Sequence, residues 1–498
     1  MVSRSENASA FSAHIQIKLM KIGLLGVLIG LICTVECNAQ DYQAVKGSSY
    51  AGALTVSDNP ASILSTPYPW DITIFSAQVK NSTNAISFNN LSYLHHGDTL
   101  AYHWTNGDIK RYAAANFNVH LLNVRLDLGR KQAISFGANI RGYLNAKTGK
   151  FNYNDTLANM NQFFNINQNT TFQGDLVSST WLELYATYSR TLWDDEKGRL
   201  NGGVTLKGQQ GVSGIYAQMN GGTVSRSVEN SLTVYSVAAG NAKYGYSNNY
   251  DLWNTNHSTG KNLKDFLTHT QGGASVDLGF EYLVKPQYVQ IYGDPDDYYE
   301  YTWKLGASLL DLGENLYVYG TQGRAAANPN SNATDVELNT KFDNFGTLAQ
   351  FNDSLATIVS SIHPLKGRYH IYNPTRFNFN VDRLLPQHFA LNADLTLNLG
   401  GSNNGTMLFT KEITLLAVTP RWETKNLGAY LPVQVTTEGH VWVGGAFKAG
   451  PLLLGVHNWA DLFAKDRTQQ GGFYLALVVR PGKGWKIKED RHYTCPTN

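Results

Sequence analysis

Side chains that could hold a metal ion gather at two places in the sequence. One group combines imidazoles with a carboxylate, both of which are common metal ligands. The other is a run of carboxylates, whose oxygens suit calcium, but it lacks the glycine spacing of a defined calcium loop. These groups are His95, His96, Asp98 and His103, and Asp294, Asp296, Asp297 and Glu300. Because both fall in polar stretches, we interpret them as solvated loop residues and expect neither a metal nor a cofactor.

The sequence contains none of the short motifs that mark common catalytic centres. It has no Gly-x-Ser-x-Gly nucleophile turn, no His-Glu-x-x-His zinc motif, no phosphate-binding loop and no Cys-x-x-Cys pair. A triad of Ser, His and Asp from distant positions stays conceivable, because such residues need not be close in sequence. We therefore expect that the protein is not an enzyme.

The polar residues must instead be positioned by strands, because apolar and polar side chains alternate in segments from residue 115 to 480. In residues 389–399, for example, Phe389 and Leu395 fall on one face, whereas Asn392 and Asp394 fall on the other. Successive side chains of a strand point to opposite faces. Each segment therefore has an apolar face and a polar face.

The charged members of these segments fall on the polar face. They are Arg141, Glu183, Asp277, Lys304 and Asp394. A soluble sheet can show the same alternation, but only a membrane barrel turns its apolar face outward and encloses the polar one. A cation facing lipid costs about 2–4 kcal/mol at mid-bilayer, so a clean apolar face favours the barrel. In a barrel, these five side chains would face the lumen.

Short turns mostly alternate with longer polar stretches along the chain, as they do in outer-membrane barrels. With residues 72–93 taken as one long first strand, we count 14 strands, and a hairpin within residues 213–238 would raise the count to 16. We interpret the polar stretches 146–179, 211–271 and 313–374 as outer loops. The sequence therefore predicts an all-β fold, a transmembrane antiparallel barrel over residues 71–481.

Residues 1–39 resemble an N-terminal extension and a cleaved export signal. Lysines precede the apolar run 22–35, which is shorter than the roughly 20 residues that a membrane-spanning helix needs. Small residues end at Ala39, after which we predict cleavage. The true start is either Met1 or Met20.

The composition fits an exported barrel. Charged residues make up only 16% of the chain, well below the ~25% of soluble domains, and the chain has 46 Gly and 28 Tyr. The formal net charge of +2 gives no reason to expect a nucleic-acid partner. We expect the outer membrane of a Gram-negative bacterium, with outer-membrane lipid and the barrel-assembly machinery as partners and with residues 482–498 as a periplasmic tail.

Two phrases resemble a known family. Residues 48–52, followed by Asp58, Asn59, Pro60 and Ala61, look like the start of Bacteroidetes outer-membrane barrels of unassigned function. Residues 306–313 look like a strand end of the same family. These barrels resemble the long-chain fatty-acid transporters of the FadL type and the PorV barrels of type IX secretion. The resemblance implies 14 strands and an N-terminal piece, here residues 41–70, that folds inward as a hatch.

The hatch is physically reasonable because residues 41–70 are rich in Ser, Gly and Pro, and proline cannot donate to a sheet. A disordered lead-in is the alternative.

Residues 335–362 show helical spacing, which predicts a short amphipathic helix. This helix would either form a lid or belong to a loop packed on itself.

The predicted function is passive transport of small hydrophobic molecules through a hatch-gated lumen, with Asn59, Pro60 and Ala61 as the hatch motif. The alternative is a barrel that transports nothing and serves as a docking platform for secretion or surface assembly. An apolar pocket behind Asn59 would favour transport, and a tightly filled lumen would favour the platform.

Overall fold

The computed structural model describes most of the chain: residues 42–92, 95–129, 131–157, 159–229, 232–286, 301–330, 333–342, 346–403, 407–459 and 469–481. The expected export signal, the C-terminal tail and the acidic group at 294–300 lie outside the described residues. So do the side chains of His95, His96 and Asp98.

The described strands close into one antiparallel barrel with 14 wall positions, which confirms the predicted fold class. Some positions are shared by two short strands, and the wall closes because β1 pairs with both β25 and β4. Around the barrel the strands are β1 (Trp70–Thr83), β4 (Gly107–Asp127), β5 (Gln132–Tyr153), β6 (Thr171–Asp194), β7 (Gly198–Glu229), β10 (Gln271–Val284), β11 (Trp303–Val318), β15 (Arg368–Tyr372) with β16 (Arg376–Leu384), β17 (Phe389–Asn398), β19 (Leu415–Glu423), β20 (Leu427–Tyr430) with β21 (Val433–Thr436), β22 (Val441–Val443) with β23 (Gly445–Ala449), β24 (Leu452–Val456) and β25 (Gln470–Val479).

The alternation seen in the sequence gives the wall its two faces. In β17, Phe389 and Leu391 are exposed on the outside, while Asn392 and Asp394 are buried inside. Leu206 of β7 and Phe280 of β10 are 61% and 55% exposed, which is the arrangement expected of a surface that faces lipid. Polar atoms gather inside because lipid offers them no hydrogen bonds.

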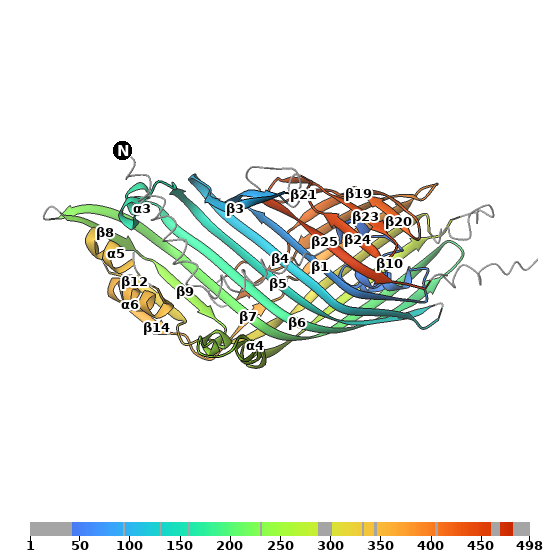
Figure 1. Cartoon of the computed structure of the whole chain (residues 1–498), viewed down its shortest axis with the longest axis horizontal. Coiled ribbons are helices and arrows are strands. Elements are labelled where there is room, and N and C mark those ends of the chain that lie inside the picture. Colours follow the sequence, from blue (N-terminus) through green and yellow to red (C-terminus); the bar gives the residue numbers. More distant parts are fainter. Residues whose placement is uncertain are drawn as a thin grey trace, which may run out of the picture.

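The two ends of the barrel differ (Figure 1). At the short-turn end, tight connections such as that between β6 and β7 join neighbouring strands. At the opposite, extended end, the wall continues beyond the barrel as β8 (Leu232–Ala238), β9 (Asn241–Tyr246), β12 (Arg324–Pro329), β13 (Ala333–Thr334) and β14 (Val359–Pro364).

The prediction of long polar loops at 146–179, 211–271 and 313–374 was therefore largely wrong. Much of this sequence is strand, because backbone pairing continues above the lipid even where both faces are polar and the alternation is lost. The suspected hairpin at 213–238 exists as β7 paired with β8, but it lengthens the wall and adds no position to the barrel. The predicted first strand, residues 72–93, was too long. In the structure β1 ends at Thr83, and β2 (Ile86–Ser92) and β3 (His95–Trp104) form a separate hairpin.

Helices lie mainly at the extended end. The predicted helix within 335–362 appears as α5 (Asp335–Phe342) and α6 (Leu348–Ile358), and α3 (Met160–Ile166) lies beside α5. Leu338 of α5 is buried against β7 and β8, which favours packing of this region onto itself. A further 3-10 turn and helix, η4 (Asn248–Leu252) and α4 (Thr259–Thr268), connect β9 to β10, and β18 (Leu408–Phe409) pairs with β15. Among the described residues, no helix has the length and apolarity needed to cross a membrane.

We predict that Leu206→Lys destabilises the barrel in lipid vesicles by about 2–4 kcal/mol, because Leu206 is a largely exposed apolar side chain on the outer face of β7. The free energy of unfolding is measured by denaturant titration, with heat-modifiable gel mobility as the readout. Val336→Lys, on an exposed position of α5, is the matched control and should change little. Equal effects of the two substitutions would contradict the placement of Leu206 against lipid.

Candidate functional site

The chain before β1 lies inside the barrel at its short-turn end. It forms three short 3-10 turns, η1 (Gln43–Val45), η2 (Gly52–Ser57) and η3 (Pro60–Leu64), which we call together the N-terminal segment, residues 42–69. Most of its residues are buried, and its contacts reach strands on all sides of the wall. The interior position follows from these contacts, since inward-facing side chains of opposite strands bind the same short segment.

Asn59 and Pro60 start η3 for a local reason. The Asn59 side chain accepts a hydrogen bond from the backbone N–H of Ala61 at 2.9 Å, and Pro60 occupies the first helical position, where no N–H is needed. The Asn59 amide also donates to the backbone carbonyl of Phe280 in β10 at 2.9 Å. The Asn-Pro-Ala phrase therefore both caps a turn and fixes that turn to the wall.

Three wall glycines make room for this turn, and we call them the glycine seat: Gly203 in β7, Gly279 in β10 and Gly306 in β11. A Cβ atom added at Gly279 would lie 2.1 Å from Asn59 Oδ1, and one at Gly203 would lie 2.6 Å from the Ala61 backbone nitrogen. One at Gly306 would lie 3.0 Å from Asn59 Nδ2. Glycine inside a strand commonly marks such a close backbone approach.

Polar contacts join the rest of the N-terminal segment to other strands. Lys46 Nζ lies 2.8 Å from Asp394 Oδ1 in β17, and the Ser48 hydroxyl donates to Glu423 in β19 at 2.7 Å. The Ser65 hydroxyl donates to Glu281 in β10. Several donors on the wall bind backbone carbonyls of the segment: Ser189 binds Pro60 at 2.6 Å, Ser308 binds Asp58 at 2.5 Å and Arg125 binds Ile63 at 2.7 Å.

Apolar side chains of the segment pack in two clusters, the first of which contains ten buried residues. Tyr42 and Leu54 pack with Tyr474 of β25, and Ile63 packs with Tyr185 of β6. The segment is therefore held by hydrogen bonds and ion pairs as much as by apolar packing. Beside Asn59 remains a polar space of about 30 Å³, which is room for about one water molecule.

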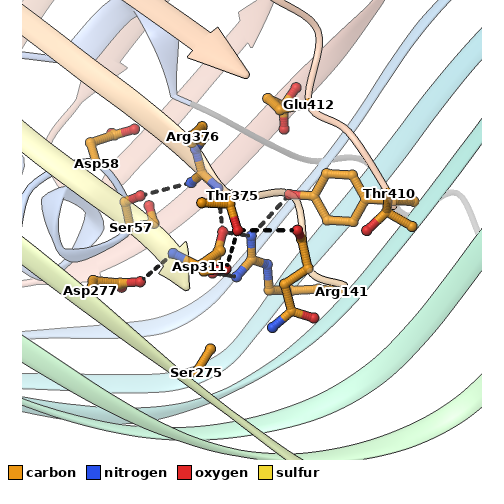
Figure 2. A network of polar contacts seen from close by, with 12 residues as sticks. Ser57, Asp58, Arg141, Ser275, Asp277, Asp311, Thr375, Arg376, Thr410 and Glu412 are labelled. Carbon is orange, nitrogen blue, oxygen red and sulfur yellow. Dashed lines mark hydrogen bonds and ion pairs between the residues drawn. The ribbon is translucent and has the colours of Figure 1, made fainter. Parts of the chain in front are cut away.

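A layer of ion pairs, centred on Asp311 of β11, crosses the lumen beside this segment (Figure 2). The Asp311 carboxylate accepts hydrogen bonds from both terminal nitrogens of Arg141, at 2.6 and 2.7 Å. It also forms an ion pair with Lys207 Nζ at 2.6 Å. Arg376 binds the same carboxylate and, through its other terminal nitrogen, donates to the backbone carbonyl of Ser57 at 3.0 Å. Asp311 thus ties three strands of the wall to the N-terminal segment.

Two further carboxylates balance the cations of this layer. The Asp277 carboxylate lies 2.7 Å from Lys207 Nζ. It also accepts a hydrogen bond from the backbone N–H of Asp311 at 2.7 Å. Glu183 lies 3.4 Å from Arg141. Three cations and three carboxylates therefore meet within one buried layer, as buried charges require.

A β-bulge turns Asp311 inward. Leu305 and Leu309 face outward, so strict alternation would turn Asp311 towards lipid as well. The pairing of β10 with β11, however, shifts by one residue at Asp277, and this bulge reverses the face of Asp311. Asp311 takes the left-handed conformation at φ +57°, which Asp tolerates better than most residues. After the bulge the outward face moves to Leu312.

The structure brings three of the five predicted lumen residues together and leaves two apart. Arg141, Glu183 and Asp277 belong to the Asp311 layer. Lys304 and Asp394 are buried elsewhere in the lumen, with Lys304 near Glu281 at 3.9 Å and Asp394 on Lys46.

Asp311, Lys207 and Arg376 were not predicted as lumen residues from the sequence. A carboxylate at an apparently lipid-facing position was the available signal for Asp311, because lipid does not tolerate it. The glycine seat was also missed, although three glycines within predicted strands indicated a close approach.

Above the ion pairs, towards the extended end, tyrosines fill the lumen. Tyr216, Tyr317 and Tyr369 are buried together, and the Tyr319 and Tyr369 rings stack at 4.5 Å. An open cavity of about 340 Å³ lies at the outer rim, lined by strands β1, β4, β5 and β6 and by residues 398–403, 409–414 and 437–438. In the described part of the chain, no group of His, Cys, Asp or Glu side chains is arranged to hold a metal ion.

The outer cavity mixes charged and apolar groups. Its lining combines the apolar Phe409 and Ile413 with charges of both signs: Lys147, Lys411, Asp175, Glu412 and Glu438. Burial, and then the neighbouring Lys147, lower the pKa of Lys411 below its ordinary value.

We predict that Asp311→Asn lowers the free energy of unfolding by about 3–5 kcal/mol, because it leaves buried cations without their shared partner. Asparagine also tolerates the left-handed backbone, so the substitution isolates the charge. Asp108→Asn, which affects an exposed pair with Lys150, is the control and should cost less than about 1 kcal/mol. A denaturant titration in vesicles that gave the two variants equal stability would contradict the role of the layer.

Comparisons with solved structures find barrels at low identity. A Pseudomonas aeruginosa FadL homologue matches with 11% identity over 90% of this chain and 99% of its own, at a TM-score of 0.41. The Ralstonia pickettii toluene transporter TbuX matches with 12% identity over 86% and 94%, at 0.37. A mutant of the TodX monoaromatic hydrocarbon channel matches with 11% identity over 86% and 94%, at 0.39.

Among curated proteins, no match is found. One family model covers most of the chain, from residue 60 to residue 457, and therefore includes Pro60 and Ala61, the glycine seat and the whole Asp311 layer. The chain belongs to the Family of unknown function (DUF5723).

Proposed function

We propose that this protein is a gated outer-membrane barrel, which lets small molecules pass when the N-terminal segment leaves the glycine seat. The observation that carries the proposal is the way the lumen is closed. A short segment covers the short-turn end and is held by apolar packing in two clusters and by directional polar contacts, each of the latter worth about 0.5–1.5 kcal/mol net. Such contacts can be exchanged for water, so the segment can serve as a hatch, with Asn59, Pro60 and Ala61 as its docking point.

The open cavity at the outer rim supports a class of solute. Phe409 and Ile413 offer apolar surface there, while two lysines and three carboxylates offer charge of both signs: Lys147, Lys411, Asp175, Glu412 and Glu438. This mixture suits small amphiphilic molecules. A purely hydrophobic solute, as expected from the family resemblance, would find apolar groups at the rim but a polar space beside Asn59. The similarity to a toluene transporter and a hydrocarbon channel is too distant to indicate the solute.

A second candidate function, the docking platform, is favoured by two observations. The N-terminal segment, the ion pairs and the tyrosines leave little space in the described lumen. The wall also continues far beyond the barrel and exposes apolar side chains, such as Val228 and Val336, each 62% exposed. A platform would hold partners on this extension and would stay closed.

Permeability separates the two candidates. We predict that Gly279→Ala raises solute entry into proteoliposomes and the conductance of planar bilayers, because the new methyl group collides with Asn59 in the seat. Gly208→Ala is the matched control, since a Cβ at Gly208 meets no atom within 4 Å. Deletion of residues 43–65 should set the upper limit of permeability.

If the deletion variant folds, by heat-modifiable mobility, and remains as impermeable as the intact protein, then the segment does not gate the lumen. The platform would then be favoured. If Gly208→Ala and Gly279→Ala increase permeability equally, the seat is not the docking point of the hatch.

A further inference from the structure

The connection between β9 and β10 lies against the outside of the barrel (Figure 1). The Asn249 amide donates to the carbonyls of Val212 in β7, at 2.7 Å, and of Phe266 in α4, at 2.9 Å. The Gln210 side chain, on the exposed face of β7, donates to Thr270 at 2.7 Å and to the carbonyl of Leu267 at 3.2 Å. These bonds fix α4 beside the wall.

The attachment point adjoins the lipid-facing band. Leu206 belongs to that band, and Gln210 follows it four residues later on the same face of β7, or about 13 Å along a strand. Gly272 of β10 pairs with Gln210 at this level, and large apolar residues of β10, such as Leu278, lie on the membrane side of it. Helix α4 therefore lies where the apolar band of the outer leaflet gives way to lipid headgroups.

The side chains of α4 fit that position. Phe266 is buried and packs edge-on against Tyr250 at 5.0 Å, which orients the helix. Successive residues turn by about 100° around a helix, so Leu263 and Leu267 share one flank of α4 and Lys261 lies on the other. Leu263 is 49% exposed, and an exposed leucine is better suited to contact with lipid than with water.

Charged and aromatic groups complete an interfacial pattern. Lys261 and Lys264 are exposed, and the half-buried Trp253 lies beside Phe266 with ring centroids 6.5 Å apart. Asp265 is the one acidic side chain within α4, so the helix carries an excess of one positive charge. Amphipathic helices with lysines and exposed leucines lie in the headgroup region, and tryptophan is enriched there.

We propose that α4 binds the phosphate groups of outer-leaflet lipids through Lys261 and Lys264, while Leu263 and Leu267 contact the acyl chains. The continuity of α4 with the lipid-facing band supports a lipid as the occupant over a soluble anion. The binding fixes the outer rim of the barrel at a defined depth in the membrane. It does not depend on whether the lumen conducts.

The test uses the full mature chain in detergent and counts bound lipid by native mass spectrometry. Diphosphorylated lipid A is the probe, and dephosphorylated lipid A and inorganic phosphate are the comparisons. We expect Lys261→Gln with Lys264→Gln to weaken binding of the phosphorylated lipid by at least about tenfold, because each lysine near a lipid phosphate contributes about 1 kcal/mol. Lys261→Arg with Lys264→Arg should retain binding, and Leu263→Gln should weaken both forms of the lipid.

Three results would overturn the proposal: equal binding of phosphorylated and dephosphorylated lipid, unchanged binding in the double glutamine variant, or displacement of the lipid by an equal concentration of inorganic phosphate. All variants change exposed side chains. Their folding is verified beforehand by heat-modifiable gel mobility.

Discussion

The carboxylate of Asp311 binds two guanidinium groups and one ammonium group, with no surface exposed to solvent. Its partners come from three other strands, Arg141 from β5, Lys207 from β7 and Arg376 from β16. A barrel in lipid can keep charges only on its inner surface, and a buried charge is tolerated only when it is paired. The interior must therefore neutralise itself, and the Asp311 layer is one of the clusters in which it does so.

This ion-pair layer also positions the N-terminal segment. Arg376 binds Asp311 with one terminal nitrogen and the Ser57 carbonyl with the other, so the wall and the segment share one cation (Figure 2). Two residues further on, Asn59 enters the glycine seat, where the absence of side chains brings two backbones together. The segment is thus held against the wall by a steric fit at Gly279, by polar contacts around it and by two apolar clusters.

The wall was largely predictable from sequence, because lipid and lumen impose opposite polarities on alternate residues. The alternation at 389–399 correctly placed Phe389 outside and Asp394 inside, and the strand count agreed with the barrel. The extended end was not predictable, since polar residues on both faces hide a strand such as the upper part of β7. At the site, alternation found Arg141 and Asp277 but missed Asp311, because a bulge and a left-handed backbone reverse its face. The fit of Gly279 to Asn59 depends on a contact between residues 220 positions apart, which no local pattern reports.

Hydrogen–deuterium exchange of the full chain in lipid nanodiscs tests whether residues 52–65 are seated inside the lumen. Seated amides are shielded from water and hydrogen-bonded, as in η3, so their exchange should be slowed to a degree comparable with that of β10 and β11. Exchange of residues 52–65 as fast as that of an unstructured peptide would contradict the account. The segment would then be a loose lead-in, and the lumen would have to be closed by other groups.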